Sequence, residues 1–181
     1  MSVEPALRDA VLASLPSLRA FAISLTNDRD RADDLVQDTI VRAWTHIDRF
    51  EPGTNLNAWL FTILRNRFYS DFRKNKREVA DPEGAHAAKL KAPPEQQSRV
   101  DYEDMRTALT KLRPDQREAL ILVAAEGLSY DEAAAICGTQ VGTIKSRVSR
   151  ARHRLAELLG HDGADDLGLD RVTKAALQAD E

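Results

Sequence analysis

One segment near the end of the chain, from about Gln140 to Leu159, combines cationic and small side chains in a way that suits contact with DNA. In a helix, successive residues turn by about 100°, which gathers the apolar side chains of this segment on one stripe. That stripe consists of Ile144, Val148, Ala151, Leu155 and Leu158. The opposite arc holds Gly142, Lys145, Ser146, Ser149, Arg150 and His153. Small residues would let the helix approach base edges, and the cations would neutralise phosphates.

The same segment is cationic along its length. From Lys145 to Arg154 it contains five Lys and Arg residues and no acid, with Arg147, Arg152 and Arg154 flanking the outward arc. A solvated face paired with neighbouring acids is the alternative, but this stretch offers no such pair within itself. The candidate DNA-contacting residues are Gly142, Thr143, Lys145, Ser146, Arg147, Ser149, Arg150 and Arg154.

The residues before this segment predict a helix-turn-helix unit. Pro114 suits the first turn of one helix, which Gly127 ends. Ser129 and Glu132 then form a capping-box pattern that starts a short helix, and Gly138 ends it. A short helix, a tight turn and a longer helix form the unit whose second helix enters the major groove.

A second segment, from about Asn55 to Arg77, mixes aromatic residues with cations. Six of the ten aromatic residues of the chain lie between Phe50 and Phe72. Its wide apolar arc, expected in the core, holds Leu56, Leu60, Phe61, Ile63, Leu64, Phe68 and Phe72. The opposite stripe holds Trp59, Thr62, Asn66, Tyr69 and Arg73. Rings stack on unpaired bases and amides bond to base edges, so this stripe favours a single strand; the alternative places Trp59 at the margin of the core.

A third segment, from Asp28 to Arg49, is locally acidic and is predicted to be helical. Its buried stripe is Ala32, Val36, Ile40, Ala43 and Ile47. The far side carries Asp34, Gln37, Asp38, Val41 and Thr45, beside Arg42. An apolar Val41 among acids is typical of a protein interface, although single exposed apolar residues are also ordinary. This side should repel DNA and suit a basic protein surface.

The elements that must position these residues are helices. In 181 residues, 43% are hydrophobic and 30% charged, with only 8 Gly and 7 Pro, which predicts an all-α fold. Apolar residues recur at steps of three and four from about Leu7 to Phe72, with a bend near Pro16, and again from about Tyr102 to Leu159. We expect two small helical domains at 1–78 and 99–160, a flexible Pro-containing linker at 79–98, and an acidic tail at 161–181.

Composition also excludes several classes of protein. The net charge of -3 means that any nucleic-acid surface is local. Cys137 is alone and expected to be a small buried residue, which fits a reducing cytoplasm. No leader peptide or membrane span is expected. The four His residues are scattered and there is no GxxxxGK or HExxH, so we expect no enzyme, no catalytic residue, no metal and no cofactor.

Taken together, these segments resemble bacterial sigma factors of the extracytoplasmic-function (ECF) group, reduced to the second and fourth regions of that family. DDLVQDTIVRAW from Asp33 is similar to the segment that docks on core RNA polymerase. NLNAWLFTILRNRFYSDFRK from Asn55 resembles the minus-10 helix, and the chain from Leu112 to Leu155 resembles the minus-35 reader. TNDRDRADDLVQDTIVRAW looks most like the EcfG-type general stress response group.

The resemblance implies a role for each candidate residue. Core polymerase would contact Asp34, Gln37, Asp38, Val41 and Arg42. A minus-10 base of promoter DNA, flipped out of the duplex, would be held by Asn57, Trp59 and Asn66, with the loop from Glu51 to Leu56. The full set of minus-10 candidates is Asn57, Trp59, Thr62, Asn66, Tyr69 and Arg73. The inhibitor would be a small NepR-like anti-sigma factor, displaced by a phosphorylated response regulator with a sigma-like domain. Val123 stands where some relatives carry arginine, and the acidic tail lies outside the pattern.

Two other functions remain open from the residues. A stand-alone helix-turn-helix regulator would need a dimer face and usually a ligand pocket, which the first module does not suggest. A sigma mimic that only sequesters an anti-sigma factor would have no use for an intact cationic recognition helix.

Overall fold

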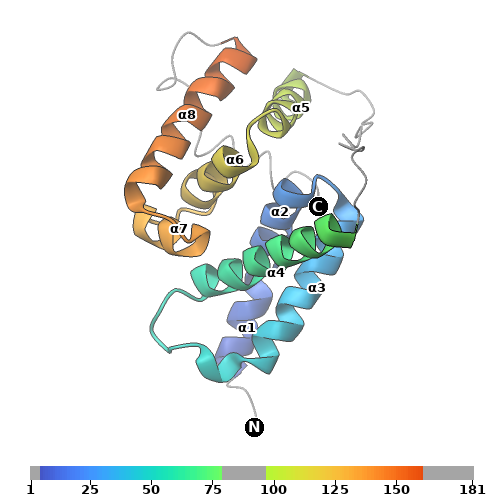
Figure 1. The fold of residues 1–181 in the computed structure, drawn as a ribbon, viewed down its shortest axis with the longest axis vertical. Helices are drawn as coiled ribbons and strands as arrows, with labels where there is room; N and C mark the ends of the chain where they lie inside the picture. Colours follow the sequence, from blue (N-terminus) through green and yellow to red (C-terminus); the bar gives the residue numbers. More distant parts are fainter. Residues whose placement is uncertain (1–4, 79–96, 161–181) are drawn as a thin grey trace. The chain divides into compact units, whose positions relative to one another are not determined.

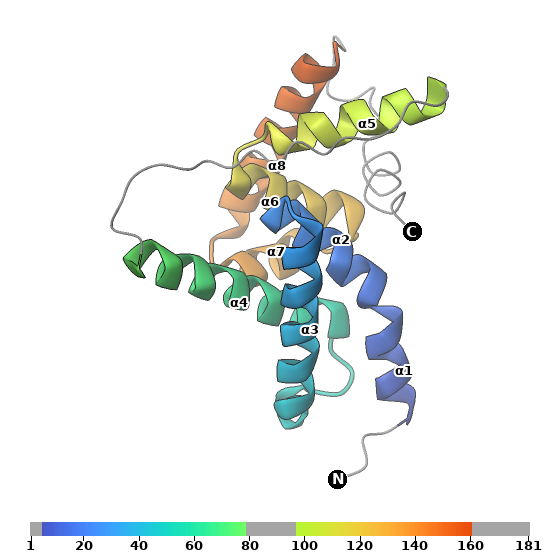
Figure 2. The ribbon, with the colours of Figure 1, turned by 90° about the vertical axis from the view of Figure 1, so that its right-hand side faces the viewer.

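The computed structural model describes residues 5–78 and 97–160, which belong to two compact units, Met1–Lys89 and Leu90–Glu181. The described residues form helices and no strand, so the all-α prediction is confirmed (Figures 1 and 2). The expected linker lies almost wholly outside them, except that a helix already begins at Gln97. The expected tail lies entirely outside them.

The first unit is a bundle of α1 (Pro5–Ala13), α2 (Leu15–Thr26), α3 (Arg29–Thr45) and α4 (Leu56–Glu78). Helices α2, α3 and α4 contact one another, and α1 contacts α2. At the centre, the rings of Phe21 and Phe61 meet edge to face with centroids 5.1 Å apart. Leu18, Leu60 and Leu64 are fully buried around them. The bend expected near Pro16 is the break between α1 and α2, with Pro16 in the first turn of α2.

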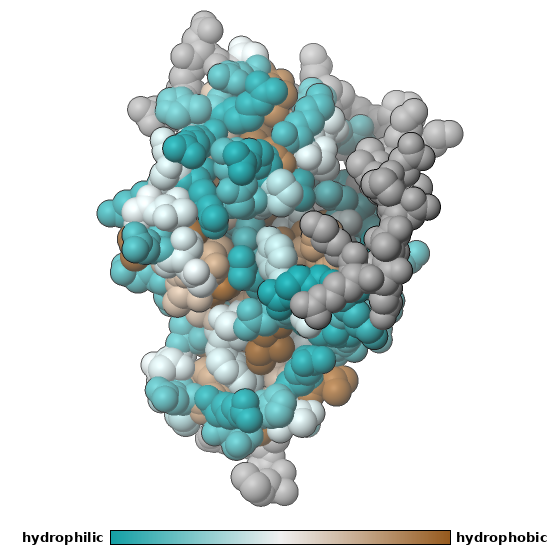
Figure 3. Space-filling model, viewed as in Figure 1, coloured by the Kyte–Doolittle hydropathy of each residue, from teal (hydrophilic) through white to brown (hydrophobic). Residues whose placement is uncertain are grey.

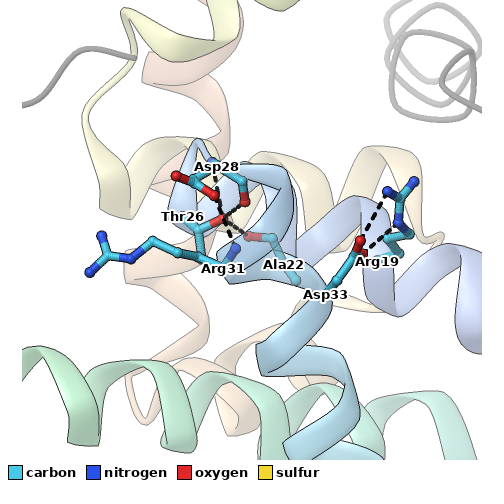
Figure 4. Close-up of polar contacts among 6 residues, drawn as sticks. All are labelled: Arg19, Ala22, Thr26, Asp28, Arg31 and Asp33. Carbon is cyan, nitrogen blue, oxygen red and sulfur yellow. Dashed lines mark hydrogen bonds and ion pairs between the residues drawn. The ribbon is translucent and has the colours of Figure 1, made fainter.

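Polar groups at the joint between α2 and α3 fix where each helix ends (Figure 4). Asn27 adopts the left-handed conformation, with φ of 52°, and closes α2. The carboxylate of Asp28 accepts a hydrogen bond from the Arg31 amide at 3.0 Å and so caps the start of α3. Such a cap stabilises a helix by about 1 kcal/mol.

Three expectations for the first unit are wrong. Phe72 was expected in the core but is 60% exposed, because it lies in the last turns of α4 beyond the buried Leu60, Phe61 and Leu64. The helix expected to reach Arg49 ends at Thr45 and is followed by the 3-10 turn η1 (Ile47–Arg49). The buried stripe of α3 also differs from the expected one: Leu35 and Thr39 are buried, whereas Ile40 is only partly buried and Ile47, also partly buried, lies in η1.

The second unit contains α5 (Gln97–Thr110), α6 (Pro114–Leu120), the π-helical turn η2 (Ile121–Ala125), α7 (Tyr130–Cys137) and α8 (Val141–Leu159). Helices α5, α6 and α7 all contact α8, which buries Ile144, Val148, Ala151 and Leu155. The expected Leu158 is only partly buried, one residue before the end of the helix. Cys137 is buried, as expected.

The short helix α7 has the ends that its sequence predicts. The Ser129 hydroxyl accepts from the Glu132 amide at 3.2 Å, and the Glu132 carboxylate accepts from the Ser129 amide at 2.8 Å. Gly138, with φ of 61°, ends α7 in the left-handed region that favours glycine. The polypeptide can therefore turn within three residues into α8, whose N-cap is Gln140. This is the predicted helix-turn-helix geometry.

Candidate nucleic-acid and protein interfaces

The outward face of α8 is open along its length. Gly142, Lys145, Ser149, Arg150 and His153 are exposed, and Thr143 and Ser146 are half-buried. A Cβ atom added at Gly142 would meet nothing within 4 Å, so this glycine leaves the backbone at the start of the helix approachable. The face thus offers hydroxyls, two exposed cations and bare backbone, which are groups that contact phosphates and base edges.

Two of the expected DNA-contacting arginines pair with acids of the protein. Arg147 lies 3.4 Å from Asp115 at the start of α6, and its side chain is only 24% exposed. Arg154 pairs with Glu157 one turn further along α8 at 2.8 Å. The stretch contains no acid of its own, but acids outside it supply these partners. The charges of Arg147 and Arg154 are thus partly neutralised within the protein. Lys145 and Arg150 are therefore the stronger candidates for phosphate contacts.

Lys145 has a neighbour that the sequence pattern did not reveal. Its Nζ lies 5.7 Å from the ring centroid of Tyr130, the first residue of α7. This cation–π contact restricts a side chain that otherwise has many rotamers. The contact joins residues fifteen positions apart, so it depends on the turn at Gly138 and not on helical spacing.

The aromatic residues of α4 divide between packing and exposure. Trp59 is half-buried, and its ring centroid lies 5.4 Å from that of Phe50. This fits the alternative in which Trp59 lies at the margin of the core, although part of its side chain remains exposed. Tyr69 stacks under the Arg65 guanidinium at 4.5 Å. The Thr62 hydroxyl donates to the Ala58 carbonyl at 2.8 Å. Asn66 and Arg73 are exposed, which leaves an amide and a cation free to face a ligand.

A hollow of about 430 Å³ lies between the end of α3 and the outward face of α4. None of the described residues that line it is acidic. Arg42, expected at a protein interface, borders this hollow together with three of the minus-10 candidates, Trp59, Asn66 and Arg73. The candidates Thr62 and Tyr69 do not line it. His46 and Arg49, which the sequence analysis did not single out, also border it. The lining is Arg42, His46, Arg49, Trp59, Ile63, Asn66, Arg67, Ser70 and Arg73.

Asn57, at the start of α4, lies away from that hollow. Its Oδ1 accepts a hydrogen bond of 2.6 Å from the Ser14 hydroxyl at the joint between α1 and α2. Ser14 is buried, whereas Asn57 is exposed. The structure therefore does not bring Asn57 into the same hollow as Trp59, Asn66 and Arg73, and it gives the Asn57 amide a fixed partner within the protein.

The far side of α3 is exposed as expected. Asp34, Gln37, Asp38, Val41 and Arg42 are all exposed, and Val41 reaches 63%. A second hollow, of about 680 Å³, borders this face between α2, α3 and α4. Asp38 there accepts a hydrogen bond of 2.8 Å from Arg67 of α4. An exposed apolar residue with acids around it remains an arrangement that suits a basic protein partner.

Asp33, the first residue of the acidic motif, has a structural partner. Arg19 of α2 donates to it at 2.7 and 3.3 Å (Figure 4). The Arg19 hydrogen bond lowers the pKa of Asp33 from its ordinary value of 3.8; desolvation opposes this shift, and the charges of Arg19 and Arg29 add to it. Asp33 therefore ties α3 to α2.

The surface shows no broad apolar region on the face drawn in Figure 3, where apolar residues form small separate patches among hydrophilic ones. Across residues 5–78 and 97–160, no group of three or more His, Cys, Asp or Glu side chains could hold a metal ion. In the same ranges no helix is long and apolar enough to cross a membrane.

Comparison with known proteins accounts for both units. The family model "Sigma-70 region 2" matches residues 10–78, and "Sigma-70, region 4" matches residues 102–155. The ECF RNA polymerase sigma factor EcfG of Rhodopseudomonas palustris (strain TIE-1) is 59% identical over 98% of both chains. The RNA polymerase sigma factor CnrH of Cupriavidus metallidurans is 35% identical over 83% of both chains.

A solved structure extends this likeness to three dimensions. The sigma factor RpoE of Bartonella quintana, crystallised in complex with the anti-sigma factor NepR, is 54% identical. The match covers 88% of this chain and 100% of that one, with a TM-score of 0.78. With both sigma regions in order and an EcfG relative matched over nearly its whole length, the chain belongs to the ECF family of RNA polymerase sigma factors.

Proposed function

We propose that this chain binds core RNA polymerase through α3, holds the unpaired minus-10 strand on α4, and reads the minus-35 duplex with α8. The observation that carries the proposal is the separation of exposed surfaces. The α3 face is acidic around Val41, while the hollow beside α4 is lined by cations and rings without a described acid. An acidic face suits a protein, and a cationic aromatic face suits a nucleic acid.

Promoter opening would then be driven by binding energy, with no chemical step. Stacking or pocketing one base contributes about 1 to 3 kcal/mol, against a few kcal/mol for unstacking it. Trp59, Asn66 and Arg73 supply a ring, an amide and a cation on the same side of α4. The protein therefore needs no catalytic residue, and we place it in the cytoplasm with its polymerase.

We also propose limits for the two domains and for the linker between them. The sigma region 2 domain spans 1–78 and the region 4 domain spans 99–160, with 79–98 as the linker. The family matches at 10–78 and 102–155 fall inside these limits and support them. A stand-alone helix-turn-helix regulator would not account for the match over the first unit.

In vitro transcription with purified core polymerase on a library of randomised promoters tests the proposal. We expect the wild-type chain to direct initiation from a subset of templates that share two short elements. A chain that binds an anti-sigma factor but starts no transcript would instead be a sigma mimic. A chain that forms a stable dimer on a palindromic DNA site, and that does not need to bind polymerase to do so, would instead be a stand-alone regulator.

A matched pair of double variants tests the polymerase face. Asp38→Lys with Val41→Glu should abolish co-purification with core polymerase while the circular dichroism spectrum stays unchanged. Asp9→Lys with Leu12→Glu makes the same changes of charge and polarity on α1, where both residues are exposed. This control should retain polymerase binding. Equal binding by both double variants would remove α3 from the proposed interface.

We further propose that a NepR-like anti-sigma factor controls the chain, within a general stress response. The support is the 54% identity to the sigma factor crystallised with NepR and the 59% identity to EcfG. Purified NepR of Bartonella quintana serves as the probe. It should bind this chain and suppress the transcription described above in proportion to its concentration. Transcription unaffected by saturating NepR would contradict this mode of control.

A further inference from the structure

Arg67, which the sequence analysis did not assign, links the polymerase-facing helix to the strand-facing helix. It lies on α4, and its Nε donates to the carboxylate of Asp38 on α3 at 2.8 Å. Its guanidinium also pairs with Asp71, one turn further along α4. The Arg67 side chain is 26% exposed, whereas that of Asp38 is 52% exposed. The arginine is thus held from one side by a carboxylate that solvent, or a partner, can reach.

Arg67 also borders both hollows of the first unit. One is the hollow of about 680 Å³ beside Asp34, Gln37 and Asp38. The other is the hollow of about 430 Å³ that holds Trp59 and Asn66. Arg67 is the residue that their two linings share. Arg67 therefore lies between an acidic neighbourhood and one whose described lining has no acid.

We propose that Arg67 is a contact for the unpaired strand that Asp38 holds back until a partner engages Asp38. The inference rests on the proposed roles of α3 and α4. With two carboxylates against it, the Arg67 charge is largely compensated in the free chain. A basic partner group on Asp38 takes one of those carboxylates and leaves Arg67 with Asp71 alone. The excess negative charge around Arg67 is then removed, and the guanidinium can bond to a phosphate in the neighbouring hollow with less repulsion.

The coupling works in both directions. If polymerase binding at Asp38 raises the affinity for the strand by some factor, strand binding at Arg67 raises the affinity for polymerase by the same factor. Polymerase on Asp38 strengthens the hold on the strand, and the strand on Arg67 frees Asp38 for polymerase. Exposed ion pairs are weak, so the factor is about twofold to fivefold. A factor of this size would adjust the binding of polymerase and of the strand, which other contacts provide, and would not act as an on-off switch.

A double-mutant cycle on the free full-length chain measures this coupling. The probe is a short fluorescein-labelled single-stranded DNA of mixed sequence, followed by fluorescence anisotropy at low salt. Asp38→Asn should strengthen binding about twofold to fivefold, because it releases Arg67. In the Arg67→Gln background the same Asp38→Asn change should strengthen binding only as much as Asp34→Asn does, because only the general gain from removing one negative charge remains. Circular dichroism melting checks that each variant is folded, and Arg67→Lys should retain part of the response.

Asp34→Asn is the matched control, because it removes the same charge from the same exposed face of α3. It should strengthen binding by less than Asp38→Asn does, and by the same amount with or without Arg67. Equal effects of Asp34→Asn and Asp38→Asn in the wild-type background, or a gain from Asp38→Asn that is as large in Arg67→Gln as in the wild type, would overturn the inference. Transcription by the Arg67→Gln chain distinguishes a failure of this inference from a failure of the proposed function. If this chain still initiates transcription and the effects of the Asp38 and Arg67 substitutions on DNA binding are additive, the proposed function stands and only the role of Arg67 is removed.

Discussion

The guanidinium of Arg147, on the recognition helix α8, lies 3.4 Å from the carboxylate of Asp115 at the start of α6. The pair fastens the helix expected to read DNA to the body of its own unit. It also divides the cations of α8 into those that face the protein and those that face solvent, since Lys145 and Arg150 are exposed.

This division predicts unequal effects on duplex DNA binding. Arg150→Ala should weaken binding to the minus-35 duplex and reduce the slope of log K against log salt by about one, as loss of one phosphate contact does. Arg147→Ala should change that slope by less, because its charge is already shared with Asp115. Anisotropy titrations over a range of salt concentrations measure both slopes. Identical slope changes would mean that Arg147 leaves Asp115 when DNA binds.

Phe61 and Phe72 lie on the same helix and should differ in their effect on stability. Phe61 is 1% exposed and packs edge to face against Phe21, so Phe61→Ala should lower the free energy of unfolding by about 3 to 5 kcal/mol. Phe72 is 60% exposed, so Phe72→Ser should stay within about 0.5 kcal/mol of the wild type. Urea denaturation followed by circular dichroism gives both values. A large loss at Phe72 would place this ring in a core contact after all.

The capping box of α7 should contribute measurably to the stability of the second unit. Ser129→Ala removes the acceptor for the Glu132 amide, and the expected loss is about 1 kcal/mol. Ser129→Asp keeps an acceptor at the same position and should recover most of that loss. The comparison requires only the urea midpoints of the three chains. Ser129→Ala with an unchanged midpoint would show that water replaces the cap without cost.

The pairing of Asp33 with Arg19 predicts a dependence of stability on pH. Because the folded pKa of Asp33 lies below its ordinary value of 3.8, the pair stabilises the fold above that pH, and this contribution disappears as pH falls through the folded pKa. With 45% of the Asp33 side chain exposed, solvent screening keeps the contribution small. Urea unfolding measured from neutral to acid pH should show that the free energy of unfolding falls less steeply for Asp33→Asn than for the wild type. Parallel curves would mean that Arg19 does not favour the ionised carboxylate.

The sequence alone determined the local features of this protein. Helix caps such as Asp28 and Ser129, the left-handed turn at Gly138 and the buried stripe of α8 depend on residues within a few positions of one another. Local hydrogen bonds and helical periodicity decide such features, so they can be read from the order of residues. The outward positions of Lys145 and Arg150 on α8 and of Val41 on α3 follow from the same periodicity.

Tertiary structure decided which of those exposed groups have partners. The pairs Arg147 with Asp115, Arg67 with Asp38 and Asn57 with Ser14 join residues on different helices. Periodicity places a side chain on a face but does not state which other helix packs beside that face. It also overestimated the burial of Phe72, because an apolar arc is covered only as far as neighbouring helices extend along it. The packing of α2, α3 and α4 therefore determines which charges remain available to polymerase and to DNA.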